Sequence, residues 1–296
     1  MDGNKNLNIS LGILVSYDYE FLKISMPKIY NYVNFILLAI DKNQMTWKGE
    51  QFVIPDSFFQ WLEIFDIEKK IHFYYYEVDF SMPSMEIETH LRNEMGKRMP
   101  KSDWYMQIDT DEYIINAEDL VSELSNINYQ NNSQIMVYTK YLPMFKSDED
   151  NVFLIDVAEK CPVFTNIPKY DTARLSHFAQ KVYSEIYFLH QSWDRKEEEI
   201  LMKIKNWGHN SDFNIYNYFN FWKTINKFNY NYIYNFHPIY PEKWNRLIKT
   251  PLINSPNFNE FIKKYIHGKK IERLKREQID RTLKSRIKYF LLRLFE

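Results

Sequence analysis

The sequence predicts an α/β protein with a mainly parallel central sheet, flanking helices and a basic helical tail. Two observations predict this class. Apolar and β-branched runs alternate with helical patterns three times before a fourth apolar run closes the series near residue 108. Residues 260–296 then carry twelve Lys and Arg against five Asp and Glu, with apolar residues at helical spacing between them. Parallel strands need crossover connections, which helices supply and which are nearly always right-handed.

The first part of the chain carries four predicted strands separated by three predicted helices. Residues 8–16 form an apolar and β-branched run, and a helical pattern follows to residue 29. Residues 33–40 are apolar throughout, which is typical of a strand that helices cover on both faces. The remaining elements are a helix over 56–70, a strand over 71–78, a helix over 85–99 and a strand over 104–108.

Beyond residue 116 the pattern becomes irregular. A strand is predicted at 134–141 and a helix at 194–206, where Asp194 is expected to cap the first turn with Glu197 three residues on. We therefore predict one large domain over residues 1–255, divided near residue 116, and a tail over residues 256–296.

Composition places the chain among globular proteins. With 296 residues and 45% hydrophobic content it can bury a large core, which excludes a disordered protein. Cys161 is the only cysteine, so a disulfide within the chain and a cysteine-based zinc site are excluded, and a cytoplasmic location is expected. No signal peptide and no apolar run near the roughly 20 residues of a membrane-spanning helix are seen. A peripheral position on the inner face of the cell membrane stays open.

Acidic residues follow the predicted strands at the point where each strand ends. Asp18, Asp41, Asp79 and Asp109 all occupy such positions. Because ligands of parallel sheets bind beyond the carboxyl ends of the strands, we expect these side chains to face one crevice. Asp109 and Asp111, separated by one residue, project the same way and can jointly bind a hard cation. A solvated acidic turn is the alternative for an isolated pair of this kind.

Two segments together resemble the core of family-2-type glycosyltransferases, which adopt the Rossmann-like GT-A fold. They run from Leu91 to Gly96 and from Asp103 to Tyr113. In that family a helix with an Arg-Asn pair precedes a hydrophobic strand that ends in D-x-D, often followed by Glu and an aromatic residue. The resemblance covers roughly residues 8–215 and is strongest over 88–114. It makes residues 1–116 a nucleotide-binding half and residues 117–255 an acceptor half.

The resemblance implies roles for several acids. Asp111 is expected to bind Mn²⁺ or Mg²⁺ directly, and Asp109 to reach the metal through water or to bind the donor ribose. Asp41 matches the acid that contacts the base or ribose in the family. At the first turn the family commonly has Asn-Glu, whereas this chain retains only an acid, Asp18, as a donor-binding candidate. A histidine completes the metal site, and His209 is preferred because Gly208 resembles a helix C-terminal cap; a surface histidine is the alternative.

The candidates for catalytic base are Glu112 and Asp150. A carboxylate must accept the acceptor hydroxyl proton if the reaction inverts the anomeric centre. Glu112 follows the acidic pair directly, although it can instead orient its neighbours. Asp150 belongs to the acidic loop 148–150, for which a solvated face is the alternative. Asp111 completes the predicted catalytic set because its metal stabilises the leaving group.

Basic and aromatic residues supply further donor-binding candidates. Arg92 has the fork of donors that suits phosphate, with structural pairing to a carboxylate as the alternative. Lys181, Arg195 and Lys203 are basic residues of the later half for which a solvated helix face is the alternative, and we select Lys181. Trp207 is a candidate for stacking on the donor. His190 is interpreted as a structural histidine at a strand end that also lies within reach of the diphosphate.

The function predicted from these features is metal-dependent transfer of a hexose from a nucleotide-diphosphate sugar, with UDP as the expected nucleotide. The resemblance implies a glycan or lipid-linked acceptor in the synthesis of bacterial surface polysaccharide. Two alternatives stay open: a sugar-nucleotide nucleotidyltransferase and a non-catalytic membrane-associated scaffold. A nucleotidyltransferase is expected to carry a Gly-rich loop after the first strand, and residues 16–19 contain no glycine.

The tail is predicted to be a basic amphipathic helix over residues 261–295. Its partner is an anionic membrane surface, the parent domain or another protein, and the sequence leaves these three open. Nucleic acid is not an expected partner, because residues 1–259 carry a net charge of −8 and no nucleic-acid-binding motif is present.

Overall fold

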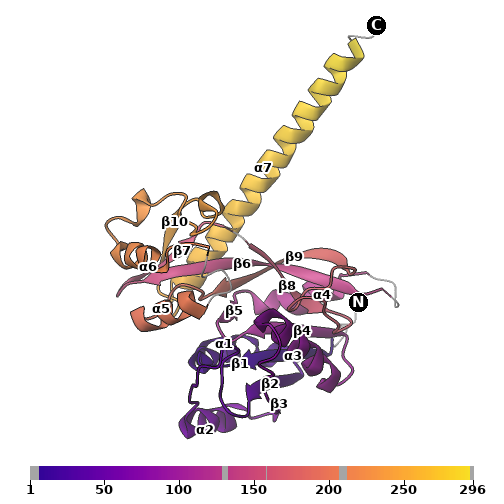
Figure 1. The fold of residues 1–296 in the computed structure, drawn as a ribbon. Coiled ribbons are helices and arrows are strands. Elements are labelled where there is room, and N and C mark those ends of the chain that lie inside the picture. Colours follow the sequence, from indigo (N-terminus) through magenta and orange to yellow (C-terminus); the bar gives the residue numbers. More distant parts are fainter. Residues whose placement is uncertain (1–6, 129–132, 158, 207–211, 294–296) are drawn as a thin grey trace.

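The computed structural model describes residues 7–128, 133–157, 159–206 and 212–293 (Figure 1). The first part of the chain follows the predicted alternation of strands and helices. Its elements are β1 (Ile9–Val15), α1 (Leu22–Ile29), β2 (Phe35–Asp41), α2 (Asp56–Phe65), β3 (Ile71–Tyr76), α3 (Ser84–Arg98) and β4 (Trp104–Asp109). The four strands are parallel, with β1 paired to both β2 and β4 and with β3 paired to β2.

Helices cover both faces of this parallel unit. Successive side chains of a strand point to opposite faces of the sheet, and here both sets are apolar and pack against helices. Ile36 and Leu38 of β2 point into the core that contains residues of α1 and α2. Leu37, between them, points into the opposite core with Leu91 of α3. The predicted α/β class, with a mainly parallel central sheet flanked by helices, is confirmed.

The second part of the chain extends the same sheet mainly through antiparallel pairings, although β6 and β9 pair in parallel. Its strands are β5 (Glu112–Ile114), β6 (Ile135–Ser147), β7 (Asn151–Ile155), β8 (Glu159–Thr165), β9 (Gln180–His190) and β10 (Leu247–Pro251). The main order is β10-β7-β6-β8-β4-β1-β2-β3, and β9 pairs with both β5 and β6. The pairing of β5 with β9 sets Glu112 opposite His190, which brings the end of β9 next to the predicted acidic turn.

Three helices follow in this part: α4 (Leu120–Ser125), α5 (Glu197–Asn206) and α6 (Ile215–Thr224). Short 3₁₀ turns lie at Tyr19–Phe21, Tyr30–Tyr32, Ala117–Asp119, Tyr230–Tyr232 and Pro241–Lys243. A separate aromatic core packs beneath α5 and α6 and contains Trp193, Trp222 and Trp244. The predicted cap of α5 is wrong. The helix begins at Glu197, and the Asp194 carboxylate accepts a hydrogen bond from Ser147 at 2.5 Å.

Helix α3 is fixed against the loop that follows β8. Gly96 allows this contact, since a Cβ atom at that position would lie 2.7 Å from the carbonyl oxygen of Pro168. Three residues earlier, the Asn93 side chain accepts from the Tyr170 N–H and donates to the Tyr170 carbonyl, both at 2.9 Å. The loop is therefore held at two points, which positions Arg174 beneath the carboxyl end of β4.

The tail forms one helix, α7 (Phe258–Arg293). Its first turns pack on the body, and the remainder projects away from it (Figure 1). Within the described residues, no helix combines the length and the apolar character needed to cross a membrane.

Candidate active site

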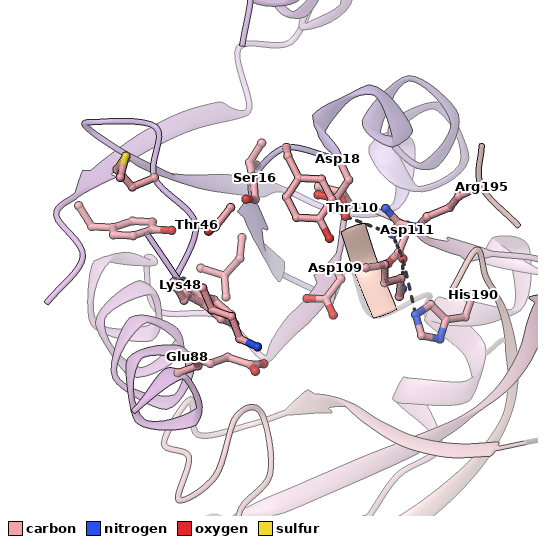
Figure 2. A pocket seen from close by; sticks show the side chains of 18 residues that line it. Ser16, Asp18, Thr46, Lys48, Glu88, Asp109, Thr110, Asp111, His190 and Arg195 are labelled. Atoms are coloured by element: carbon pink, nitrogen blue, oxygen red, sulfur yellow. Dashed lines mark hydrogen bonds and ion pairs between the residues drawn. The ribbon is translucent and has the colours of Figure 1, made fainter. Parts of the chain in front are cut away.

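A pocket of about 300 Å³ opens where the carboxyl ends of β1 and β4 lie side by side. In the sheet, β2 lies on one side of β1 and β4 lies on the other. The pocket therefore lies at the point where the strand order reverses, and ligands of parallel sheets commonly bind there. Its lining comes from the ends of β1, β3 and β4, the turns after β1, β2 and β4, helix α3, and the end of β9 with the segment that follows it (Figure 2). These residues include Ser16, Tyr17, Asp18, Met45, Thr46, Trp47, Lys48, Glu88, Asp109, Thr110, Asp111, His190, Arg195 and Lys203.

Asp109 presents its carboxylate to the middle of this pocket, and its side chain is 43% exposed. Arg92 Nη2 donates to Asp109 Oδ1 at 2.6 Å, and Arg92 Nε donates to Glu88 Oε1 at 2.9 Å. Burial favours a higher pKa for Asp109, but the guanidiniums of Arg92 and Arg174 outweigh it and hold that pKa below its ordinary value. Asp109 is therefore ionised at neutral pH.

Glu112 fixes the backbone of the acidic turn from below. Its carboxylate accepts from the Asp109 N–H at 3.0 Å and from the Tyr141 hydroxyl at 2.7 Å. The Arg174 guanidinium grips the same carboxylate with two nitrogens, at 2.7 and 2.5 Å. Glu112 is 1% exposed and does not line the pocket, so its observed contacts are those of a residue that positions the turn.

Asp111 faces a cluster of basic groups on the other side of the turn. Arg195 Nη2 donates to Asp111 Oδ2 at 2.6 Å, and Lys203 Nζ and His190 Nε2 lie 3.6 and 3.7 Å from the same oxygen. Burial favours a higher pKa for Asp111, but His190, Lys203 and Arg195 together hold it well below its ordinary value. Asp111 therefore carries its negative charge into the pocket wall.

Asp18 shares the guanidinium that binds Asp111. Arg195 Nη2 lies 3.3 Å from Asp18 Oδ2, and burial raises the pKa of Asp18 above its ordinary value. Burial together with the Arg195 charge lowers the pKa of Lys203 to about 8. Asp18 and Asp111, which follow two different strands, thus meet Arg195 and Lys203, which follow β9. We call these four residues, with Asp109, the charged wall of the pocket.

Several predicted residues lie elsewhere among the described parts of the chain. The Asp41 carboxylate is buried and accepts backbone N–H groups of Asn43, Met45 and Val78, each at 3.0 Å. It shapes the loop that lines the pocket rather than lining the pocket itself. Asp79 is exposed and binds Ser81. The expectation that four strand-end acids face one crevice thus holds for two of them, Asp18 and Asp109.

Three other candidates also lie outside the pocket lining. Arg92 is buried beneath it, where it pairs with Asp109. Asp150 lies on the turn between β6 and β7, with its side chain 71% exposed and 3.8 Å from Lys227. Lys181 lies on β9, with its Nζ atom 5.8 Å from the centre of the Tyr138 ring. Trp207 and His209 fall outside the described residues.

Sequence reasoning ranked Lys181 above Arg195 and Lys203, and it passed over Arg174 and Lys48. Arg195 and Lys203 reach the pocket because β9 pairs with β5, a contact between residues far apart in the chain. The backbone N–H of Gln191 donates to the Asp111 carbonyl at 2.9 Å and secures that approach. The signal available in the sequence was His190 at the end of a predicted strand, followed by Arg195 and Lys203 within the predicted helix 194–206.

The residues present offer oxygen ligands to a divalent cation. Arg92 binds Asp109 through Oδ1 and Arg195 binds Asp111 through Oδ2, so the second oxygen of each carboxylate lies outside these two ion pairs. No group of three or more His, Cys, Asp and Glu side chains that could hold a metal occurs in those residues. A cation at Asp109 and Asp111 therefore needs further ligands from phosphate or water, as Mg²⁺ sites commonly do.

No protein-family description matches the chain, and no curated protein sequence matches it. Among solved structures, residues 1–349 of S. aureus TarS align with a TM-score of 0.38 and 9% identity over 68% of this chain and 66% of TarS. A Bacillus anthracis protein described as a glucose-1-phosphate thymidylyltransferase aligns at 0.33 and 8%, covering 61% of this chain and 88% of that one. Mannose-6-phosphate isomerase from Helicobacter pylori aligns at 0.32 and 10%, covering 45% and 51%.

The chain thus spans about half of the isomerase and 66% of TarS. TM-scores this low carry no argument about function. The α/β class with a mainly parallel sheet follows from the strand order of this chain itself.

Proposed function

We propose that this chain is a glycosyltransferase whose donor, a nucleotide-diphosphate sugar, binds in the pocket at the ends of β1 and β4. The observation that carries the proposal is the charged wall at the point where the strand order reverses. Asp109 faces the pocket there, and Asp111 stands beside Arg195 and Lys203. Such a wall suits a ligand that combines a cation, a diphosphate and hydroxyl groups.

The two ends of the pocket suit the two ends of a nucleotide. Trp47, Met45 and Tyr76 supply flat and apolar surface for a base on the side near Lys48. Arg195 lies on the opposite side of Asp109 from Lys48 (Figure 2). Arg195 and Lys203 both approach Asp111 and supply positive charge for the diphosphate. UDP is the nucleotide we propose, because the family that the sequence resembles commonly uses it.

Transfer of the sugar leaves negative charge on the departing diphosphate, and charge stabilisation is the main task of the site. Arg195 and Lys203 are positioned to stabilise that charge, since Asp111 holds both nitrogens at the pocket wall. Mn²⁺ or Mg²⁺ held by Asp109 and Asp111 would supply further Lewis-acid stabilisation of the same charge. Glu112 holds the turn so that both carboxylates face the donor.

Our proposal for the acceptor rests only on the resemblance to the glycosyltransferase family. We propose a glycan or a lipid-linked sugar used in the synthesis of bacterial surface polysaccharide. Of the described residues beyond β5, His190, Arg195 and Lys203 line the pocket.

A thermal-shift screen of UDP-, GDP-, CMP- and dTDP-sugars, each with and without Mn²⁺, tests donor binding. We expect a UDP-sugar to raise the melting temperature and Asp109→Asn to remove most of that rise. Asp79→Asn is the matched control, because Asp79 is also a strand-end acid but lies outside the pocket. Stabilisation by none of the donors with metal present contradicts the proposal.

Product analysis separates the nucleotidyltransferase alternative. A glycosyltransferase releases UDP from the UDP-sugar when acceptor is present, whereas a nucleotidyltransferase releases pyrophosphate from a nucleoside triphosphate and a sugar phosphate. The turn after β1, residues 16–19, contains no glycine, whereas a Gly-rich loop is expected there for a nucleotidyltransferase. A non-catalytic scaffold would release neither product.

A further inference from the structure

The described contacts between helix α7 and the body come from its first third. Phe258 and Ile262 are 2% and 0% exposed and pack with Tyr113 and Leu189. The Tyr265 hydroxyl donates to Asp156 Oδ1 at 2.6 Å, and Lys269 Nζ lies 2.7 Å from the same oxygen. These contacts fix the direction in which the helix leaves the body.

Beyond Lys269 the helix continues for more than twenty residues, and no other element of the described part of the chain lies beside it (Figure 1). Ile271 is 39% exposed and Leu283 is 56% exposed. In this structure the distal part of the tail projects from the body and does not lie on it (Figure 1).

The last part of α7 has a composition unlike that of the rest of the helix. Residues 271–280 still contain three acids, whereas residues 281–293 contain no acid. The five basic residues of that stretch are Arg281, Lys284, Arg286, Lys288 and Arg293. At 1.5 Å per residue the stretch is about 20 Å long, so it concentrates positive charge at the far end of the projecting helix.

Apolar positions in the same stretch follow helical spacing. Positions 283, 287, 290 and 291 fall within one face of a regular α-helix and hold Leu, Ile, Phe and Leu. Lys284 and Lys288 fall on one flank of that face, and Arg286 and Arg293 fall on the other. An apolar stripe between two basic flanks is the pattern of helices that lie in the interface of an anionic bilayer.

We propose that residues 281–293 of α7 bind the surface of an anionic lipid bilayer. The opposite charge of acidic headgroups complements the five basic side chains, and the apolar stripe enters the boundary below the headgroups. A second copy of the chain is disfavoured as the occupant, because two such stretches would bring ten positive charges together without an acid among them. The proposal is independent of the reaction at the pocket.

Co-sedimentation of the full chain with vesicles tests this docking. We expect binding to vesicles that contain phosphatidylglycerol, weak binding to pure phosphatidylcholine, and release at high salt because screening weakens the attraction. Each basic residue near such a surface contributes about a fivefold change in affinity. The double variant Lys284→Glu with Lys288→Glu should therefore lower the affinity by at least about 30-fold.

The double variant Lys263→Glu with Lys264→Glu is the matched control. It makes the same change in net charge on the same helix, at residues beside the body whose ion-pair partners are exposed. We expect it to bind close to wild-type levels, and helical circular dichroism checks that both variants keep α7. Equal loss in both variants, or equal binding of wild type to neutral vesicles, would overturn the proposal.

Light scattering of the chain without lipid decides between lipid and a second copy. A monomer supports the proposal. A dimer that Leu283→Glu converts to a monomer, together with absence of vesicle binding by the wild type, would overturn it.

Discussion

One guanidinium, that of Arg195, lies between carboxylates that belong to different strands. Asp18 follows β1 and Asp111 follows β4, and both approach the same nitrogen of Arg195, at 3.3 and 2.6 Å. The arginine is 2% exposed, so the three charges interact with little screening by water. Arg195 therefore closes the gap between the ends of two strands and also carries positive charge into the pocket.

Replacement of Arg195 by Gln should weaken both roles. The two carboxylates would face each other without a cation, which costs about 3 kcal/mol of the free energy of unfolding. Donor affinity should fall on the order of tenfold or more, since a charged hydrogen bond to phosphate is lost. Urea denaturation measures the first effect and calorimetric titration with UDP the second. Arg195→Lys should recover part of both, and wild-type donor affinity in Arg195→Gln would refute the assigned role.

Lys203 should make donor binding depend on pH. Its pKa is lowered to about 8 by burial and by Arg195, so the free protein loses this positive charge as the pH rises through that value. A bound diphosphate favours the charged form, and donor affinity should therefore be full below pH 8 and decline above it. Titration of UDP from pH 6.5 to 9.5 measures the decline. Lys203→Met should bind more weakly at pH 7 and show a flatter profile over the same range.

The sequence correctly predicted pocket residues whose positions depend only on the local geometry of the chain. Asp109 is the last residue of β4 and Asp111 comes two residues later, so the position of one strand end is enough to place both. Arg195 and Arg174 could not be ranked, because their places depend on the pairing of β5 with β9 and on the clamp between Asn93 and Tyr170. Neither contact leaves a periodic signal in the chain.

Helix α3 connects the core of the sheet to the pocket and to the loop after β8. Its Arg92 pairs with Asp109, its Asn93 holds Tyr170, and its Gly96 admits Pro168. These three residues explain why an Arg-Asn pair precedes the acidic strand in this chain. The pair supports the acidic turn from the side away from the pocket. Arg92 is 1% exposed there, so phosphate does not reach it.

Gly96→Ala should lower stability although alanine favours helices. The new methyl group would lie 2.7 Å from the Pro168 carbonyl oxygen, and such overpacking costs about 1–3 kcal/mol. Gly268→Ala, within α7, is the matched control because nothing lies within 4 Å of its added methyl group. We expect it to be neutral or to stabilise by up to about 1 kcal/mol. Chemical denaturation compares the two, and equal stability of both variants would contradict the close contact.

The regular elements were predictable where hydrophobic periodicity is strong. The strands β1 to β4 and the helices between them lie within a few residues of the predicted ranges. The strands and helices beyond residue 116 were predicted less completely, because β6, β8 and β9 pair with distant partners and bulges shift their register. The predicted cap at Asp194 failed for the same reason, since Ser147 of β6 holds that carboxylate.

Across the whole molecule, the body and the distal part of α7 should behave independently. A chain that ends after residue 270 retains the buried contacts of Phe258 and Ile262. Its melting temperature should stay within about 2 °C of the full chain, because no apolar core is lost, and its donor affinity should be unchanged. Differential scanning calorimetry and UDP titration measure these quantities. A large drop in melting temperature would mean that the distal part supports the body.

The single cysteine of this chain has a practical consequence. Cys161 lies on β8, and burial raises the pKa of its thiol to about 12, so its reactive thiolate form is scarce at neutral pH. A cysteine introduced at exposed Leu283 would consequently accept a maleimide dye with little competition from the natural thiol. Fluorescence from that single probe would report, in real time, whether the end of the projecting helix enters a less polar medium.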